Sequence, residues 1–223
     1  SQISAQAKKT AKLDEISISG IKAEVTRDEN SCIGATQVTV YNADNPPNLM
    51  ACNRLREPSW MGLDIETTGV DLIRNDMVFS IQFCIPSANE ESKPQDQHVF
   101  VLYNIPEILE SMQSTNNAKW MKFFKAFWDA LHVTQIIGHN LAFDLIGVFK
   151  IFQEAPFEYS LSSIANMCKP GKTLDTYLMC KYMENGLKTS LSLENSIKKH
   201  LNIELEKGLH DDFKTSTKAE GFV

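Results

Sequence analysis

This chain of 223 residues lacks several features that mark common classes of protein. No two cysteines have the C-x-x-C spacing of a zinc or redox site, and the number of cysteines is odd. The five are scattered along the chain: Cys32, Cys52, Cys84, Cys168 and Cys180. This pattern argues against a disulfide framework and favours free thiols in a reducing, intracellular compartment.

Long apolar runs are also missing. No stretch reaches the length of a membrane-spanning helix, so we expect no membrane partner. Residues 1–14 are polar and lack the apolar segment of a secretory signal. The chain contains no internal repeat and no low-complexity tract, so neither a solenoid nor a disordered array is expected.

An excess of positive charge is absent as well, because the net charge is −6 and the pI is about 5.4. A protein that coats duplex nucleic acid without specificity needs a basic surface, so this class is disfavoured. Nucleic-acid chemistry is not excluded, because bound metal ions and local lysines can supply a positive field. The hydrophobic content of 43% is typical of a globular domain.

Two parts are expected along the chain. Residues 1–56 form an N-terminal extension with a small β hairpin, over 16–25 and 36–41, and a linker rich in Asn and Pro. Residues 57–223 form the main domain. Its patterns predict strands at 60–66, 78–85, 98–103 and 135–137, and helices at 120–131, 141–152, 174–182 and 191–201. The aromatic stripe of the first helix is expected in the core, opposite Lys119, Lys122 and Lys125.

The most informative segment is 62–71, G-L-D-I-E-T-T-G-V-D. Asp64 and Glu66 stand two residues apart in an apolar strand, and such residues point to the same face, roughly 6–7 Å apart. Two anions held side by side are costly unless a cation lies between them. The spacing therefore predicts a divalent-metal site, with Mg²⁺ or Mn²⁺ favoured by oxygen ligands.

A third carboxylate belongs to the segment 136–144, I-I-G-H-N-L-A-F-D. Asn140 is a good helix N-cap after a strand, and Asp144 lies one turn later on the same helix face. Gly147 continues this face and would allow another backbone segment or a ligand to approach the helix closely. Taken alone, Asp144 is more simply a solvated helix carboxylate. Together with Asp64 and Glu66, it is better interpreted as a third metal ligand.

These two segments, D-I-E-T-T-G and G-H-N-L-A-F-D, together resemble the 3′–5′ exonucleases that carry a D-E-D-D set of carboxylates in a ribonuclease H-like fold. The resemblance is greatest to the proofreading domain of family A DNA polymerases and to ribonuclease D. Residues 173–179 and 190–205 also resemble segments of these domains. The resemblance covers about residues 60–213.

The resemblance implies an α/β fold, with a ribonuclease H-like mixed sheet of about five strands flanked by helices. The small N-terminal β appendage, which the residue pattern predicts, would precede it. The resemblance also implies two divalent cations, Mg²⁺ or Mn²⁺, that straddle the scissile phosphate. Asp64 would bridge both ions, Glu66 would hold the ion that activates water, and Asp144 would support the second ion.

The implied function is metal-dependent removal of nucleotides from the 3′ end of single-stranded DNA. The domain would serve proofreading, with a polymerase module in the same polypeptide as its partner. An RNA 3′-processing exonuclease like ribonuclease D uses the same site and stays an alternative. A non-catalytic scaffold that binds nucleic acid or protein is a third hypothesis.

Five further residues are candidates for substrate contacts. Thr67 and Thr68 follow the first carboxylates and could contact the 3′-terminal nucleotide, although turn formation is the simpler interpretation. His139 and Asn140 belong to the second segment, and a structural hydrogen-bonded role is the simpler interpretation of His139. Asp175 either faces the cleft or caps the helix that follows it.

The family's fourth motif, Y-x-x-x-D or H-x-x-x-x-D, is missing from this sequence. After residue 205 only the segment 210–213, H-D-D-F, is a candidate, and His210 is followed five positions later by Thr215 instead of Asp. We therefore expect a domain truncated before its last motif, with little activity as an isolated piece. If the ligand is lost altogether, the scaffold hypothesis gains weight.

Overall fold

The computed structural model describes residues 22–25, 36–56, 58–87, 96–113, 117–155, 167, 169–184 and 190–204. Its centre is a sheet made of β1 (Lys22–Val25), β2 (Thr36–Tyr41), β3 (Trp60–Thr67), β4 (Val78–Pro86), β5 (Gln97–Tyr103), β6 (Gln135–Gly138) and β7 (Thr173–Asp175). The helices are α2 (Leu49–Arg54), α3 (Ile105–Met112), α4 (Asn117–Val133), α5 (Leu141–Glu154), α7 (Thr176–Glu184) and α8 (Leu193–Leu201).

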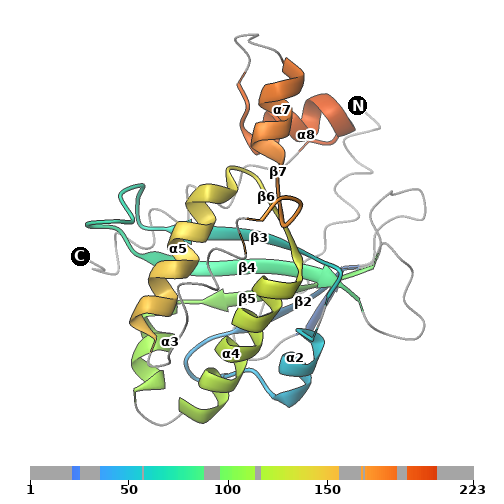
Figure 1. Cartoon of the computed structure of the whole chain (residues 1–223). Coiled ribbons are helices and arrows are strands. Elements are labelled where there is room, and N and C mark those ends of the chain that lie inside the picture. Colours follow the sequence, from blue (N-terminus) through green and yellow to red (C-terminus); the bar gives the residue numbers. More distant parts are fainter. Residues whose placement is uncertain are drawn as a thin grey trace, which may run out of the picture.

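The strand order across the sheet is β1-β2-β5-β4-β3-β6-β7. Strands β3, β4 and β5 form the predicted antiparallel meander, while β6 and β7 add in parallel beside β3. Helices α4 and α5 lie across one face of the sheet (Figure 1). The predicted α/β class, a mixed sheet flanked by helices, is confirmed.

The N-terminal strands belong to the same sheet, which differs from the expected small appendage. Strands β1 and β2 pair in antiparallel fashion, as the hairpin prediction requires. Strand β2 then pairs in parallel with β5 over six residues, from Thr36 opposite Gln97 to Tyr41 opposite Leu102. This pairing covers an edge of β5 that would otherwise expose unpaired backbone groups. The boundary near residue 56 stays a prediction, and residues 16–21 lie outside the described part.

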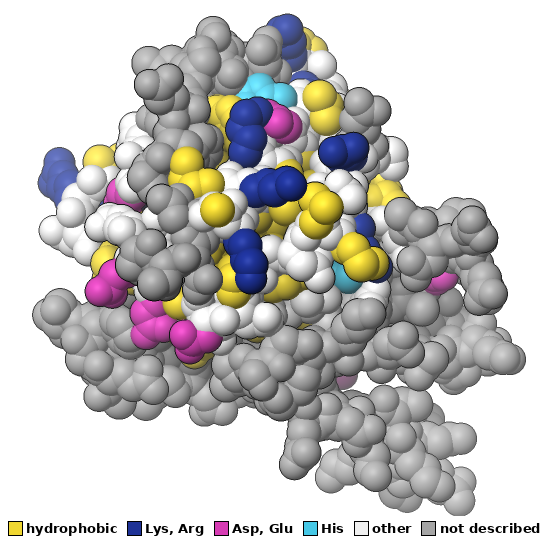
Figure 2. All heavy atoms as spheres, turned by 90° about the horizontal axis from the view of Figure 1, so that it is seen from below, with side chains coloured by type: hydrophobic (Ala, Val, Ile, Leu, Met, Phe, Trp, Pro, Cys, Tyr) yellow, Lys and Arg dark blue, Asp and Glu magenta, His cyan; other side chains and the backbone are white. Residues whose placement is uncertain are grey.

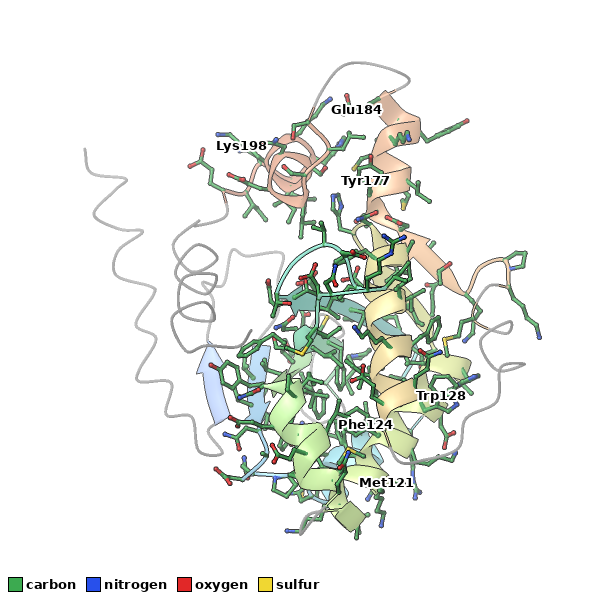
Figure 3. The ribbon with its side chains drawn as sticks, turned by 90° about the vertical axis from the view of Figure 1, so that its left-hand side faces the viewer. Met121, Phe124, Trp128, Tyr177, Glu184 and Lys198 are labelled. Atoms are coloured by element: carbon green, nitrogen blue, oxygen red, sulfur yellow. The ribbon has the colours of Figure 1, made fainter. Side chains whose placement is uncertain are left out.

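The core lies between the sheet and the helices. The aromatic stripe of α4 is buried as predicted, and Phe127 stacks on Phe83 of β4 at 4.7 Å between ring centroids. Phe124 and Trp128 both contact Phe152 of α5, at 5.8 and 4.5 Å (Figure 3). Burial of several aromatic rings in one contact network fixes α4 and α5 on the sheet.

The opposite side of α4 is solvent-exposed, and it carries Lys119, Lys122 and Lys125. Lys125 forms an exposed ion pair with Asp129 one turn later. On the face seen from below, Lys and Arg side chains are interspersed with apolar ones (Figure 2). Helix α4 is therefore the expected amphipathic helix, with aromatic rings inside and charges outside.

Three elements were not expected from the sequence. Helix α2 lies in the predicted linker, where the Asn48 side chain accepts a hydrogen bond from Ala51 N at 3.0 Å. Helix α3 follows β5, and a proline occupies its first turn. Strand β7 includes the first residues of the predicted 174–182 helix and pairs with β6. The sequence did not predict this strand, because three residues are too few to show a strand period.

Helices α7 and α8 lie together beyond β7, at one end of the molecule (Figure 1). Residues 205–223, which hold the candidate segment 210–213 for the fourth motif, lie outside the described part. Within that part, no helix combines the length and apolar character needed to cross a membrane.

Candidate carboxylate site

Strand β3 presents Asp64 and Glu66 on the face of the sheet opposite to Leu63 and Ile65. Leu63 and Ile65 are buried, whereas Asp64 is exposed and Glu66 is half-buried. The alternation follows from the two-residue period of a strand. The two carboxylates are therefore not buried as a pair, which lowers the desolvation cost that the sequence alone suggested.

Asp144 is brought to this strand by the close packing of α5. Gly147 makes the packing possible, because a Cβ atom at this position would overlap Ile65 and lie 2.9 Å from Val78 Cγ2. Asp144 is only 4% exposed, and its Oδ1 accepts a hydrogen bond from Ile65 N at 3.2 Å. It is thus a buried carboxylate against β3, and the solvated alternative is wrong.

The electrostatics of Asp144 reflect this position. Burial, followed by the negative charge of Asp64, raises the pKa of Asp144 from 3.8 to about 7. The hydrogen bond from Ile65 N opposes this rise, and the charge of Asp175 adds a smaller contribution to it. Asp64 and Asp144 therefore lie close enough for the charge of Asp64 to disfavour the ionised form of Asp144.

Asp175 joins two helix N-termini. Its carboxylate accepts hydrogen bonds from Asn140 N and Leu141 N, both at 3.0 Å, at the start of α5. The same group accepts a bond from Tyr177 N at 2.9 Å, at the start of α7. A carboxylate is a favourable cap for helix N–H groups. The capping interpretation of Asp175 therefore describes its contacts, and a substrate contact stays a prediction.

This cap replaces the one expected from Asn140. Asn140 adopts a left-handed backbone conformation, with φ 63° and ψ 43°, and its side chain makes no capping hydrogen bond. Asn tolerates this conformation better than most residues. The side chain of Asn140 is exposed at the mouth of α5, so it is available to a ligand.

His139 is held by two polar contacts. Its Nδ1 lies 3.0 Å from Thr176 Oγ1, and its Nε2 lies 2.7 Å from the carbonyl oxygen of Leu191. Both ring nitrogens thus connect the end of β6 to α7 and to the segment before α8. This is the structural role that the sequence favoured for His139.

Thr67 ends β3, and Thr68 begins the turn that follows it. Thr67 Oγ1 donates to the carbonyl oxygen of Gly69 at 2.5 Å, and Thr68 Oγ1 accepts from Met77 N at 3.0 Å. Asp76 reinforces the loop by accepting from Asp71 N at 2.6 Å. Lys150 of α5 donates to two carbonyl oxygens of this loop, a tether that no sequence pattern signalled.

The donor set can be compared with what a divalent cation needs. In the described part of the chain, no three His, Cys, Asp or Glu side chains are grouped so as to hold a metal ion by themselves. Mg²⁺, however, is usually held by one or two carboxylates and keeps waters or substrate phosphates as its other ligands. The neighbouring carboxylates Asp64 and Asp144 fit that kind of site, since a cation would relieve their repulsion.

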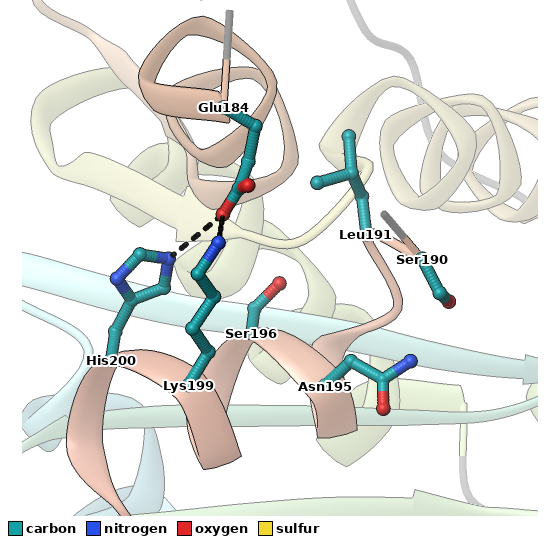
Figure 4. A pocket seen from close by; sticks show the side chains of 7 residues that line it. All are labelled: Glu184, Ser190, Leu191, Asn195, Ser196, Lys199 and His200. Atoms are coloured by element: carbon teal, nitrogen blue, oxygen red, sulfur yellow. Dashed lines mark hydrogen bonds and ion pairs between the residues drawn. The ribbon is translucent and has the colours of Figure 1, made fainter. Parts of the chain in front are cut away.

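A pocket of about 210 Å³ lies elsewhere, between α7 and α8 (Figure 4). Among its lining residues is Glu184, a buried carboxylate that pairs with Lys199 and lies 3.8 Å from His200 Nε2. None of the predicted site residues lines this pocket. The pocket and the carboxylate site are therefore separate features.

No protein-family model matches this chain, and no curated protein sequence matches it. Solved structures with a similar fold include the Aedes aegypti Nibbler EXO domain, with 15% identity and a TM-score of 0.42. That match covers 71% of this chain and 66% of the domain, slightly less than two thirds of it.

Two other solved structures show the same degree of likeness. Brucella melitensis NrnC with bound Mg²⁺ has 15% identity and a TM-score of 0.44, over 81% of this chain and 73% of NrnC. A structure of the yeast NOT1 MIF4G domain co-crystallised with CAF1 gives 11% identity and a TM-score of 0.45, over 81% and 89%. The likeness to all three structures is distant.

Proposed function

We propose that this chain is a metal-dependent 3′–5′ exonuclease domain that hydrolyses phosphodiester bonds at nucleic-acid 3′ ends. The observation that carries the proposal is the position of Asp144, buried against β3 beside Asp64. Folding the two carboxylates together without a cation costs free energy, which is the pattern expected where function outweighs stability.

The residues of the site have distinct proposed tasks. Asp64 and Asp144 hold the cation, and Glu66, which shares the face of Asp64, completes the acidic edge of β3. A bound divalent cation supplies an activated water and neutralises charge on the phosphate. Ile65 N fixes the orientation of Asp144, while the exposed amide of Asn140 would contact the terminal nucleotide.

The finer proposal is DNA proofreading, with a polymerase module in the same polypeptide. It is supported by the resemblance of the segments 64–69 and 138–144 to family A proofreading domains. Two ions and a DNA substrate belong to this proposal. The alternative is RNA 3′-end processing, which a preference for RNA over DNA substrates would support.

A non-catalytic scaffold is the second candidate function, and one observation favours it. The described residues contain no group of three protein ligands for a metal ion. A scaffold would bind nucleic acid without any need for the carboxylates. Its affinity for nucleic acid would then be independent of Asp64.

The test combines cation binding with cleavage. We expect the wild-type chain to bind Mn²⁺ and Asp64→Asn to lose this binding, measured by electron paramagnetic resonance of free Mn²⁺. In the polymerase-linked polypeptide of the proposal, the same variant should lower cleavage of 3′-labelled DNA about a thousandfold. Asp129→Asn, an exposed carboxylate on α4, is the matched control and should change neither quantity.

The contrary result is equally concrete. A wild-type chain that takes up no Mn²⁺, with nucleic-acid affinity unchanged by Asp64→Asn, would replace the nuclease proposal with the scaffold. Comparing labelled DNA and RNA of one sequence decides between proofreading and RNA processing. The sequence-based expectation of weak cleavage by the 223 residues alone is checked in the same assay.

A further inference from the structure

Gln82 on β4 is a polar residue next to the carboxylates that has no role in the site described so far. The strand register sets Gln82 directly opposite Asp64, and Ser80 directly opposite Glu66. Opposed residues of antiparallel strands share a face of the sheet, with Cβ atoms about 4.5–5.5 Å apart. Gln82 therefore lies on the carboxylate face, beside Asp64.

The side-chain amide of Gln82 has a hydrogen-bonded nitrogen and an oxygen without a hydrogen bond among the described residues. Its Nε2 donates to Ser80 Oγ at 2.6 Å, and Ser80 is only 1% exposed. Its Oε1 is buried and has no hydrogen-bond partner in the described part of the chain. The bond to Ser80 thus fixes an amide whose oxygen is left over.

An unsatisfied buried oxygen lowers stability, and an apolar residue at this central strand position would avoid the cost. Such groups need a specific explanation, and an ion or a catalytic role is among the recognised ones. The amide oxygen is a hydrogen-bond acceptor, so it cannot bind a phosphate oxygen. It suits a strong donor, such as a water molecule polarised by a cation.

We propose that Gln82 is a positioning residue of the carboxylate site, whose Oε1 accepts a hydrogen bond from a water of the cation held by Asp64. The proposal rests on the proposed function. Ser80 orients the amide, so the chain of contacts runs from Ser80 through Gln82 to the hydrated cation. Oε1 is buried in this structure, so its surroundings must open for a water molecule to reach it.

The experiment measures two quantities on the full chain: the Kd for Mn²⁺ and the melting temperature in EDTA. For Gln82→Leu we expect a Kd about tenfold weaker, the effect typical of an outer-sphere partner of a metal site. In EDTA the melting temperature of this variant should be equal or higher, because the unsatisfied oxygen is gone. Ser80→Ala should weaken Mn²⁺ binding in the same direction, by a smaller factor.

Two further variants sharpen the result. Gln82→Glu keeps an acceptor oxygen and should bind Mn²⁺ at least as tightly as the wild type. Gln153→Leu removes an exposed amide at the end of α5, remote in sequence from the site strands, and should change neither quantity. A purely structural role for Gln82 predicts instead a lower melting temperature in EDTA for Gln82→Leu, with unchanged Mn²⁺ affinity.

The possible failures can be told apart. Wild-type Mn²⁺ affinity in Gln82→Leu, with loss of binding in Asp64→Asn, would overturn the role of Gln82 and leave the proposed nuclease site intact. Absence of Mn²⁺ binding by the wild type would overturn both. If Gln82→Leu does not fold, weakened binding in Ser80→Ala supports the proposal, and unchanged binding in that variant overturns it.

Discussion

Different forces hold helix α5 and the α7–α8 helix pair in place. Helix α5 packs on β3 and β4 through buried apolar side chains and the close approach at Gly147. Helix α8 has no buried residue, and α7 buries only Cys180 and Glu184. The α7–α8 pair is held by polar contacts, through His139 and the ion pair of Glu184 with Lys199.

Because of this difference, α5 is rigidly placed on the sheet, whereas the α7–α8 pair can change its local structure more easily. Asp144 lies on an element whose position is fixed by packing, so its carboxylate cannot easily move away from β3. The α7–α8 pair has few buried apolar contacts, and its ion pair is partly exposed to solvent. Its local unfolding should therefore cost little free energy. We infer that packing holds the carboxylate of Asp144 in place, while the helices beyond β7 open more easily.

The largest expected effect tests the rigid region through pH. The pKa of Asp144 is about 7 in the folded protein against 3.8 when exposed, so the folded state keeps a proton that the unfolded chain loses. The free energy of unfolding should therefore fall as pH rises from about 4 to about 7, by at most roughly 4 kcal/mol. Urea unfolding at several pH values measures this slope.

Asp144→Asn should remove this slope, and so should saturating Mg²⁺ in the wild type, because a cation favours the ionised carboxylate. Asp129→Asn should keep it, since that side chain is exposed. An identical pH dependence in wild type and Asp144→Asn would show that Asp144 does not carry the shifted proton.

The second effect tests the packing directly. Gly147→Leu should destabilise the protein by roughly 2–3 kcal/mol, because its side chain must displace Ile65 and Val78. Ala142→Leu, on the exposed side of the same helix, should stay within roughly 0.5 kcal/mol of wild type. Chemical unfolding of both variants checks this contrast, and equal stabilities would contradict the close approach.

The smallest effect belongs to the polar region. Glu184→Gln removes the charge that pairs with Lys199, and Lys199 is half-exposed, so the loss should be about 1 kcal/mol or less. We expect faster hydrogen exchange in α8 with little change in the global unfolding midpoint. Glu204→Gln breaks only an exposed pair with Lys198 and serves as control. A shifted global midpoint would show that α7 and α8 unfold with the core.

Several elements followed from sequence patterns because those patterns have strong periods. The alternation of β3 and β4 and the aromatic stripe of α4 each extend over enough residues to identify the element. Strand β7 and helix α2 escaped because each is short and depends on partners distant in sequence. The extension of the sheet by β2 was missed because nothing local to residues 36–41 specifies the edge of β5.

The sequence by itself determined that Asp64 and Glu66 share a face, because the two-residue period of a strand is a local property. Only the tertiary structure decided that Asp144 is buried beside Asp64, and that Asp175 instead of Asn140 caps α5. It also set Gln82 opposite Asp64. Burial, like-charge proximity and strand register depend on contacts between residues far apart in the chain, and no local pattern encodes them.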